Sequence, residues 1–187
     1  MKRRELIKKA CLVGNSGVGK KTIAKIVAPF VKGIERYTQT IGAAVTKYGL
    51  EFQYGDQIVR LMVMVWDVTG KEDYQRLQPA YYAGAEGVIV VADASFEDSI
   101  NAIPHWIVAA RNVAGDIPSV VIVNKTDLIT SDNLMKLQER VKLLVKPFGS
   151  PIYFVDTESS TKAQLKAPFH VLAKEILMRS GPSAPEV

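Results

Sequence analysis

The segment from Gly14 to Lys20 has the residue types and spacing that most directly indicate chemistry in this 187-residue chain. Its G-x-x-x-x-G-K pattern lets backbone N–H groups converge on phosphate oxygens. Lys20 would reach the terminal phosphates, and a following helix would direct its positive N-terminus at the same charge. A fortuitous glycine-rich turn is the alternative, but the segment lies between a predicted strand and a predicted helix. The predicted phosphate-site residues are Gly14, Asn15, Ser16, Gly17, Val18, Gly19, Lys20, Lys21 and Thr22.

A second motif, Asn124-Lys125-Thr126-Asp127, directly follows an apolar run. It resembles the guanine-reading motif of the GTPase superfamily, and open α/β sheets bind ligands at the carboxyl ends of such strands. The resemblance implies that Asp127 accepts hydrogen bonds from guanine N1 and N2, which adenine cannot supply, so ATP would leave a carboxylate unpaired. Asn124 and Lys125 would brace the loop and the base, and Leu128 is a further predicted contact. Alone the string could be a surface turn, but its pairing with the glycine-rich loop makes chance improbable.

The elements that must position these motifs are predicted from the spacing of apolar residues. Short apolar runs predict strands over Ala10–Val13, Ile58–Trp66, Gly87–Ala92, Ser119–Val123 and Pro151–Val155. Apolar residues three and four apart predict helices over Lys20–Val31, Phe96–Val113, Asn133–Lys146 and Gln164–Arg179. The segment Ala43–Phe52 predicts one antiparallel edge strand, joined by a hairpin turn at Tyr54–Gln57. The expected fold class is α/β, with an about six-stranded, mostly parallel sheet and helices on both faces.

From about Leu6 to Met178 the sequence resembles the Ras and Rab group of small GTPases. The resemblance implies a P-loop NTPase G domain over residues 1–180, followed by a tail at 181–187. The segment Phe154–Ser160 falls where that family contacts the guanine oxygen through a backbone N–H, so Glu158, Ser159 and Ser160 are predicted nucleotide contacts. Ser160 replaces a lysine, and the stacking and bracing that a lysine provides are expected to be absent.

The resemblance also implies a magnesium site and two nucleotide-sensing loops near residues 33–42 and 68–80. Asp67 would hold Mg²⁺ through water, with a helix N-cap as the alternative, and Gly70 would meet the γ-phosphate. Thr40 would coordinate Mg²⁺ and sense the γ-phosphate, and Tyr37 would contact the nucleotide. These loops would bind regulatory or effector proteins. Tyr81 and Tyr82 are assigned equally to that interface and to the core.

The sequence departs from the family directly after the P-loop lysine, where Lys21 replaces the Ser or Thr that ligates magnesium. An ammonium group cannot ligate a cation. One hypothesis has Lys21 stand in for the metal ion by neutralising phosphates; the other has Lys21 face solvent while phosphates, Thr40 and water hold the metal. The neighbouring Thr22 lies about 100° further around a helix and is expected to face elsewhere.

The second departure is Lys71, where the family carries the glutamine that orients the attacking water. Lysine cannot accept a hydrogen bond from that water, so slow intrinsic hydrolysis is predicted, although Lys71 would also suit charge stabilisation on the γ-phosphate. The predicted catalytic residues are Lys20, Thr40, Gly70 and Lys71. A guanine-nucleotide switch using GTP, GDP and Mg²⁺ is the leading hypothesis, and a pseudo-GTPase binding module is the alternative. A P-loop ATPase or kinase is disfavoured by the guanine motif.

Composition restricts partners and location. The chain has 24 Lys and Arg against 19 Asp and Glu, and its basic N-terminal run is interpreted as a solvated end. No nucleic-acid partner is expected, because no aromatic residues interleave with that run. The single cysteine, Cys11, excludes an internal disulfide and favours a cytoplasmic location. No membrane span is expected, and residues 181–187 offer no cysteine for prenylation.

Overall fold

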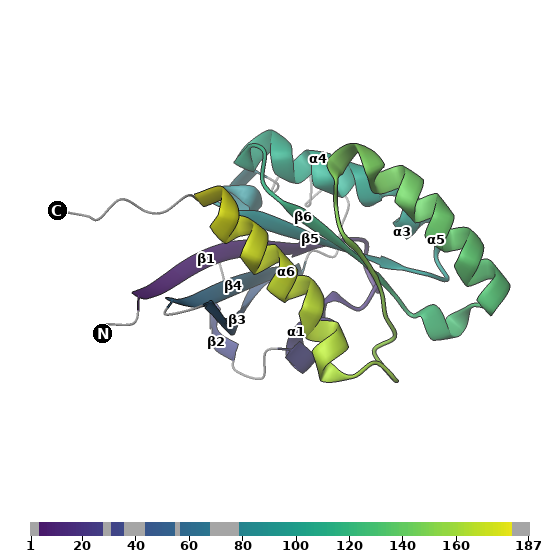
Figure 1. The fold of residues 1–187 in the computed structure, drawn as a ribbon, viewed down its shortest axis with the longest axis horizontal. Coiled ribbons are helices and arrows are strands. Elements are labelled where there is room, and N and C mark those ends of the chain that lie inside the picture. The colour runs from purple at the N-terminus through teal and green to yellow at the C-terminus, as the bar shows by residue number, and fades with distance from the viewer. Residues whose placement is uncertain (1–3, 28–30, 36–43, 55–56, 68–78, 181–187) are drawn as a thin grey trace.

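A computed structural model describes residues 4–27, 31–35, 44–54, 57–67 and 79–180 of the chain. One sheet contains seven strands in the order β2-β3-β4-β1-β5-β6-β7 (Figure 1). Strand β3 runs antiparallel to β2 and β4, and the remaining pairs are parallel. The strands are β1 (Arg4–Val13), β2 (Val31–Glu35), β3 (Ala44–Tyr54), β4 (Gln57–Asp67), β5 (Gly87–Asp93), β6 (Ser119–Asn124) and β7 (Ile152–Phe154).

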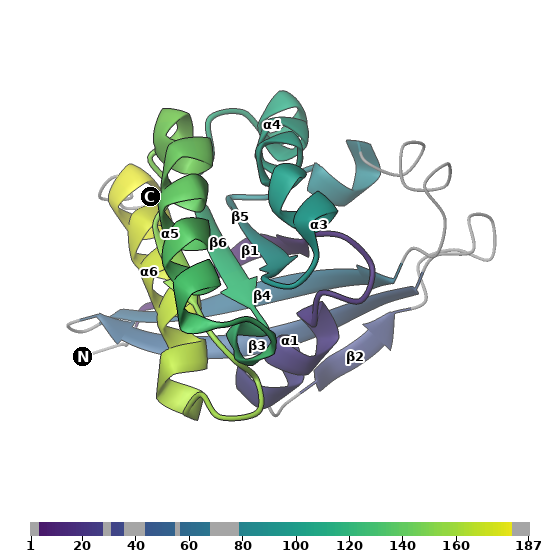
Figure 2. The same ribbon diagram turned by 90° about the vertical axis from the view of Figure 1, so that its right-hand side faces the viewer.

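Helices cover both faces of this sheet (Figure 2). Helices α1 (Lys20–Val27) and α6 (Lys162–Ser180) pack on one face. The other face carries α3 (Glu97–Asn101), α4 (Ile103–Ala114), α5 (Ser131–Val145) and a helical turn at 79–82. Two short 3-10 helices, η1 (Thr126–Leu128) and η2 (Lys146–Phe148), follow β6 and α5. None of the helices in the described part of the chain is long and apolar enough to cross a membrane.

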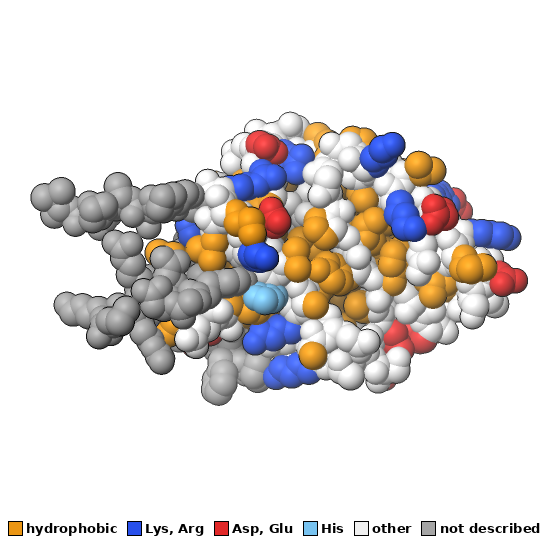
Figure 3. Space-filling view, in the orientation of Figure 1, with side chains coloured by type: hydrophobic (Ala, Val, Ile, Leu, Met, Phe, Trp, Pro, Cys, Tyr) orange, Lys and Arg blue, Asp and Glu red, His pale blue; other side chains and the backbone are white. Residues whose placement is uncertain are grey.

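The central strands form because both of their faces are buried. Alternate residues of β5 enter opposite cores: Ile89 and Val91 pack toward α1 and α6, whereas Val88 and Val90 pack toward α4. A parallel strand covered on both sides needs apolar residues at every position, and all seven residues of β5 are buried. The face in Figure 3 shows apolar side chains between α5 and α6, with charged side chains of both signs around them.

The predicted mostly parallel sheet with one antiparallel strand is confirmed, and the hairpin pairs Tyr54 with Gln57. However, the antiparallel strand β3 is not at the edge, because β2 pairs outside it and brings the sheet to seven strands. Residues 33–35 of the expected nucleotide-sensing loop therefore belong to a strand. Only two of the five β2 residues are large and apolar, so this strand left little periodic signal in the sequence.

Two predicted helices differ from expectation, one by a division and one in its length. The helix predicted over Phe96–Val113 is divided into α3 and α4 at Ala102. Pro104 lies in the first turn of α4, where its missing N–H is tolerated; inside one continuous helix it would break a backbone hydrogen bond. The helix predicted over Lys20–Val31 ends at Val27, and Val31 begins β2.

The N-terminal basic run is not simply a solvated end, because β1 extends back to Arg4. Lys8 forms an ion pair of 2.7 Å with Glu86, and the Lys9 Nζ donates to the carbonyl oxygens of Tyr81 and Ala83. Because this half of β1 carries several charged residues, the pattern of apolar runs did not predict it as a strand.

Tyr81 and Tyr82 belong to the core, since their side chains are only 2% and 0% exposed. The Tyr81 hydroxyl lies 2.9 Å from the Leu12 oxygen and 2.8 Å from the Met64 oxygen, and so links the helical turn at 79–82 to β1 and β4. The interface alternative for this pair does not apply to the described conformation.

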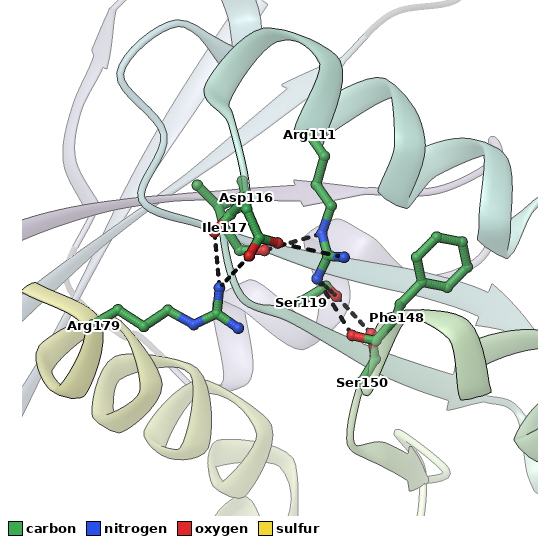
Figure 4. Close-up of polar contacts among 7 residues, drawn as sticks. All are labelled: Arg111, Asp116, Ile117, Ser119, Phe148, Ser150 and Arg179. Atoms are coloured by element: carbon green, nitrogen blue, oxygen red, sulfur yellow. Dashed lines mark hydrogen bonds and ion pairs between the residues drawn. The ribbon is translucent and has the colours of Figure 1, made fainter.

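A polar network connects α4, β6, η2 and α6 (Figure 4). The Arg111 guanidinium donates to the oxygens of Ile117 at 3.2 Å and Phe148 at 3.4 Å. Asp116 lies between Arg111 and Arg179, with ion-pair distances of 3.6 Å and 3.4 Å. These contacts satisfy loop carbonyls and join elements, which indicates a structural role.

Candidate functional site

The phosphate-type loop joins the end of β1 to the start of α1 in a conformation that requires glycine. Gly14, Gly17 and Gly19 have φ angles of +137°, +78° and +100°. A β-carbon on Gly14 would lie within 3.0 Å of the Val91 oxygen, so that position also lacks space for a side chain. Glycine is needed both for these backbone angles and for the close approach of the backbone.

Lys20 folds back over this loop from the first turn of α1. Its Nζ atom donates to the carbonyl oxygens of Gly14 and Asn15, at 2.7 Å each. The side chain is half-buried, so its positive charge is held within the loop beside the N-terminus of a helix. The arrangement places a fixed cation and a helix N-terminus together, as an anion site requires.

Asn124, the last residue of β6, connects the second motif to this loop. It is fully buried, and its Nδ2 donates to the Val18 oxygen at 3.0 Å across 106 positions of sequence. Its Oδ1 atom is buried and finds no hydrogen-bond donor within the described part of the protein. The two motifs therefore meet at the carboxyl edge of the sheet, with one acceptor left unsatisfied.

Lys125 is held by an acidic residue that the sequence did not single out. It adopts the left-handed conformation at φ 61° and ψ 39°, and its Nζ lies 2.6 Å from Asp93 Oδ2. Burial alone would raise the pKa of the Asp93 carboxyl, but hydrogen bonds from Lys125 and Ser95 lower it below the usual value. Asp93 is the last residue of β5 and lies directly beside Asn124, the last residue of β6. Its place at the end of a strand is the feature from which it could have been predicted.

Asp127 and Leu128 lie in η1 with exposed side chains. The preceding Thr126 fixes the loop, because its backbone N and its Oγ1 both donate to the Val155 oxygen, at 3.3 Å and 3.1 Å. The Asp127 carboxylate thus stands at the surface next to the two motifs, in a loop tied to the segment after β7. This geometry is suitable for accepting hydrogen bonds from a base.

The segment of Glu158, Ser159 and Ser160 is organised by Asp156, a second acidic residue that sequence reasoning missed. Asp156 Oδ1 accepts from the Glu158 N–H at 2.8 Å, and Oδ2 accepts from the Ser159 hydroxyl at 2.5 Å. These bonds lower the pKa of the Asp156 carboxyl. The Ser160 Oγ accepts from the Asp156 N–H at 3.0 Å, so Ser160 braces its own loop although it lacks the reach of a lysine.

Trp106 of α4 is half-buried and contacts the phosphate-type loop. Its Nε1 donates to Asn15 Oδ1 at 3.0 Å. The two residues lie 91 positions apart, so only the fold reveals this contact.

The metal half of the expected site is largely outside the described residues. Tyr37, Thr40, Gly70 and Lys71 lie there, and Asp67 is described only as the last residue of β4. Lys21 and Thr22 are both exposed in the first turn of α1. Among the residues that the structure describes, no group of three or more His, Cys, Asp or Glu could hold a metal ion. The chemistry of Lys21 does not fit the usual magnesium donor set, because an ammonium offers no lone pair.

The described residues fit the phosphate part of a nucleotide. A glycine-rich loop with no room for β-carbons at Gly14 and Gly19, a cation fixed inside it, and an orphaned buried acceptor on Asn124 occur at one edge of the sheet. Phosphate would lie at the cradle, and the base at the loops of Asp127 and Ser159. The nucleotide would supply the phosphate charge that Lys20 and the α1 N-terminus are arranged to meet.

Comparison with known proteins agrees with this arrangement. The chain is 28% identical to the Ras-related protein Rab-13 of Mesocricetus auratus, over 92% of this chain and 81% of that protein. It is 30% identical to the Ras-related protein RIC1 of Oryza sativa subsp. japonica, over 91% and 81%, and 28% identical to the GTP-binding protein yptV2 of Volvox carteri, over 91% and 76%. The Ras family model matches residues 9–178. With this match over nearly all of its length, the chain belongs to the Ras family.

Proposed function

We propose that the protein is a guanine-nucleotide-binding molecular switch that hydrolyses GTP to GDP slowly. The observation that carries the proposal is the hydrogen bond between Asn124 Nδ2 and the Val18 oxygen, which joins the base motif to the phosphate loop. Membership of the Ras family and the Rab-type relatives support a small GTPase switch.

In this proposal each described residue has a physical task. Lys20 and the loop N–H groups bind the phosphates, and Asp127 and the Ser159 N–H recognise the base. Asn124 joins the base loop to the phosphate loop, and Lys125 braces the base loop against Asp93. Guanine would be selected because its N1 and N2 donors pair with the Asp127 carboxylate, whereas adenine has no such donors.

We infer that nucleotide binding depends less on magnesium than family membership alone would suggest. Lys21 is exposed at the first position after Lys20, and its ammonium would repel a divalent cation placed beside it. The same charge would neutralise part of the phosphate charge. Thr40 and Asp67 would be the remaining metal contacts, the latter through water.

Slow turnover is inferred from Lys71, which cannot accept a hydrogen bond from an attacking water. The alternative function is a pseudo-GTPase module that holds nucleotide without significant hydrolysis, and the replacements at Lys21, Lys71 and Ser160 favour it. In either case regulatory or effector proteins would bind the loops near 33–42 and 68–80. No nucleic-acid partner and no membrane-spanning role are proposed.

Binding of GDP, GTP, ADP and ATP to the purified protein, with and without EDTA, tests this function. We expect a strong preference for guanine nucleotides that Asp127→Ala reduces and that Asp132→Ala, an exposed residue on α5, leaves unchanged. Equal binding of ADP and GDP would contradict the proposal. Phosphate release in a single turnover then separates the switch from the pseudo-GTPase, and loss of nearly all binding in EDTA would contradict the weak magnesium dependence.

A further inference from the structure

The indole of Trp106 reaches from α4 to the phosphate loop. Its Nε1 donates to Asn15 Oδ1 at 3.0 Å. An indole nitrogen can only donate, so this contact determines which end of the Asn15 amide faces α4. The NH₂ group of Asn15 must point away from Trp106, and the loop is attached to a helix that contributes no residue to the phosphate motif.

Asn15 also accepts a hydrogen bond from the phosphate-loop lysine. Its backbone oxygen accepts from Lys20 Nζ at 2.7 Å. The residue is therefore held from two directions, through its side chain by α4 and through its carbonyl by Lys20. A displacement of Asn15 would move an oxygen that fixes the position of the Lys20 ammonium.

The α4 end of this contact is firmly placed. Ile103 and Ile107, which flank Trp106 on the helix, are fully buried against the sheet, and the Trp106 ring packs on the same core. The rings of His105 and Trp106 stand at an interplanar angle of 71°, with 6.1 Å between their centroids. Because the core fixes the indole, the indole can in turn restrain the loop.

We propose that Trp106 is a positioning residue of the nucleotide site. It acts through Asn15 to hold the phosphate loop and Lys20 in their binding geometry, and thereby slows the release of bound nucleotide. The consequence for release rests on the proposed guanine-nucleotide function; the restraint of the loop does not.

Two substitutions at the ends of the contact test the proposal. Trp106→Phe keeps an aromatic ring but removes the N–H donor, and Asn15→Ala removes the acceptor. We expect faster hydrogen–deuterium exchange of the amides at 14–19, and release of a fluorescent GDP analogue that is about three- to tenfold faster. Both variants break the same hydrogen bond, so the double variant should release the analogue no faster than either single one.

Arg111→Met provides a control on the same helix. Arg111 donates to Ile117 and Phe148 at the other end of α4 (Figure 4), and none of its contacts among the described residues is with the loop. The variant should lower the unfolding temperature while leaving loop exchange and GDP release unchanged. Unchanged loop exchange in Trp106→Phe, additive effects in the double variant, or equal effects from Arg111→Met would overturn the proposal. If the wild type binds no guanine nucleotide, the proposed function fails, and loop exchange still decides whether Trp106 positions the loop.

Discussion

The side-chain amide of Asn124 lies so close to Gly19 that a β-carbon built on the glycine would stand less than 3.0 Å from its Nδ2 atom. The last strand residue before the base loop and the last glycine of the phosphate loop are therefore in direct contact. The absence of a side chain at position 19 lets Asn124 reach the Val18 oxygen. This one contact joins the phosphate-type loop to the loop that is proposed to recognise the base.

Gly19→Ala should consequently disrupt both halves of the site. The new methyl group would displace the Asn124 amide, and the φ of +100° would strain any side chain. We expect GDP affinity to fall by at least about tenfold, with about 2 kcal/mol lost from the free energy of unfolding. Titration calorimetry and urea unfolding measure the two effects.

Gly84→Ala separates backbone strain from loss of the contact. Gly84 has a φ of +68°, but no atom lies within 4 Å of its added β-carbon. This variant should lose about 1 kcal/mol of stability and retain GDP affinity. If Gly19→Ala binds GDP as well as Gly84→Ala does, the link between Asn124 and Gly19 has no role in binding.

The ion pair between Asp93 and Lys125 predicts a dependence of stability on pH. Because folding lowers the Asp93 pKa from its usual 3.8, the pair contributes stability above that value and loses it as the pH falls through the lower, folded-state value. Asp93→Asn should destabilise the protein by about 1–3 kcal/mol at pH 7. The difference from wild type should shrink below about pH 4.

Urea unfolding from pH 3 to pH 7 checks this expectation. Asp98→Asn is the matched control, since Asp98 is an exposed carboxylate on the nearby helix α3. A constant difference between Asp93→Asn and wild type across this range would show that the carboxylate charge does not stabilise the base loop.

Removing the buried hydroxyl of Tyr81 should lower the free energy of unfolding while leaving its aromatic ring in the core. Tyr81→Phe removes the hydroxyl that lies 2.9 Å from the Leu12 oxygen and 2.8 Å from the Met64 oxygen. We expect a loss of about 1–2 kcal/mol in the free energy of unfolding. Tyr153→Phe serves as the control, because the half-buried Tyr153 hydroxyl makes no hydrogen bond in the described part of the chain. Equal effects of both substitutions would assign no stabilising role to the Tyr81 bridge.

The sequence was sufficient to predict those strands and helices that have a clear apolar pattern within their own residues. Strands such as β5 are apolar at every position because both sides are buried, so their place could be predicted. Strand β2 and the first half of β1 could not, because they carry glycine or charged residues and owe their conformation to pairing with β3 and β4. The helix break at Ala102 could have been found, since Pro104 disfavours a continuous helix.

The residues of the candidate site also divide into those that the sequence could predict and those that it could not. The two motifs could be predicted because glycine spacing and the Asn-Lys-x-Asp string are contiguous in sequence. Asp156 and Trp106 could not, because each is a single residue whose importance comes from a neighbour brought close by the fold. For Asp93 the signal was its place directly after a predicted strand. Trp106 also shares the apolar spacing of a core helix, and only its indole nitrogen distinguishes its role.

Lys21→Ser should introduce a magnesium requirement. Serine supplies the hydroxyl oxygen that a divalent cation can use and removes a competing positive charge. We expect EDTA to weaken GDP binding by about tenfold or more in this variant and by much less in the wild type. Lys25→Ser, an exposed position one turn further along α1, should behave as the wild type. An identical response of wild type and Lys21→Ser to EDTA would remove Lys21 as the cause of any unusual metal dependence.

Lys71→Gln should accelerate hydrolysis if the proposed slow turnover arises at this residue. Position 71 lies outside the described residues, so the expectation depends on chemistry alone: a glutamine side chain can accept a hydrogen bond from water through its oxygen, and a lysine cannot. Phosphate release in a single turnover should rise by about tenfold or more, with GTP affinity unchanged. Lys146→Gln, at an exposed position in η2, should leave the rate unchanged. Slower release by Lys71→Gln would instead favour charge stabilisation of the γ-phosphate by Lys71, whereas no release by either protein would favour the pseudo-GTPase.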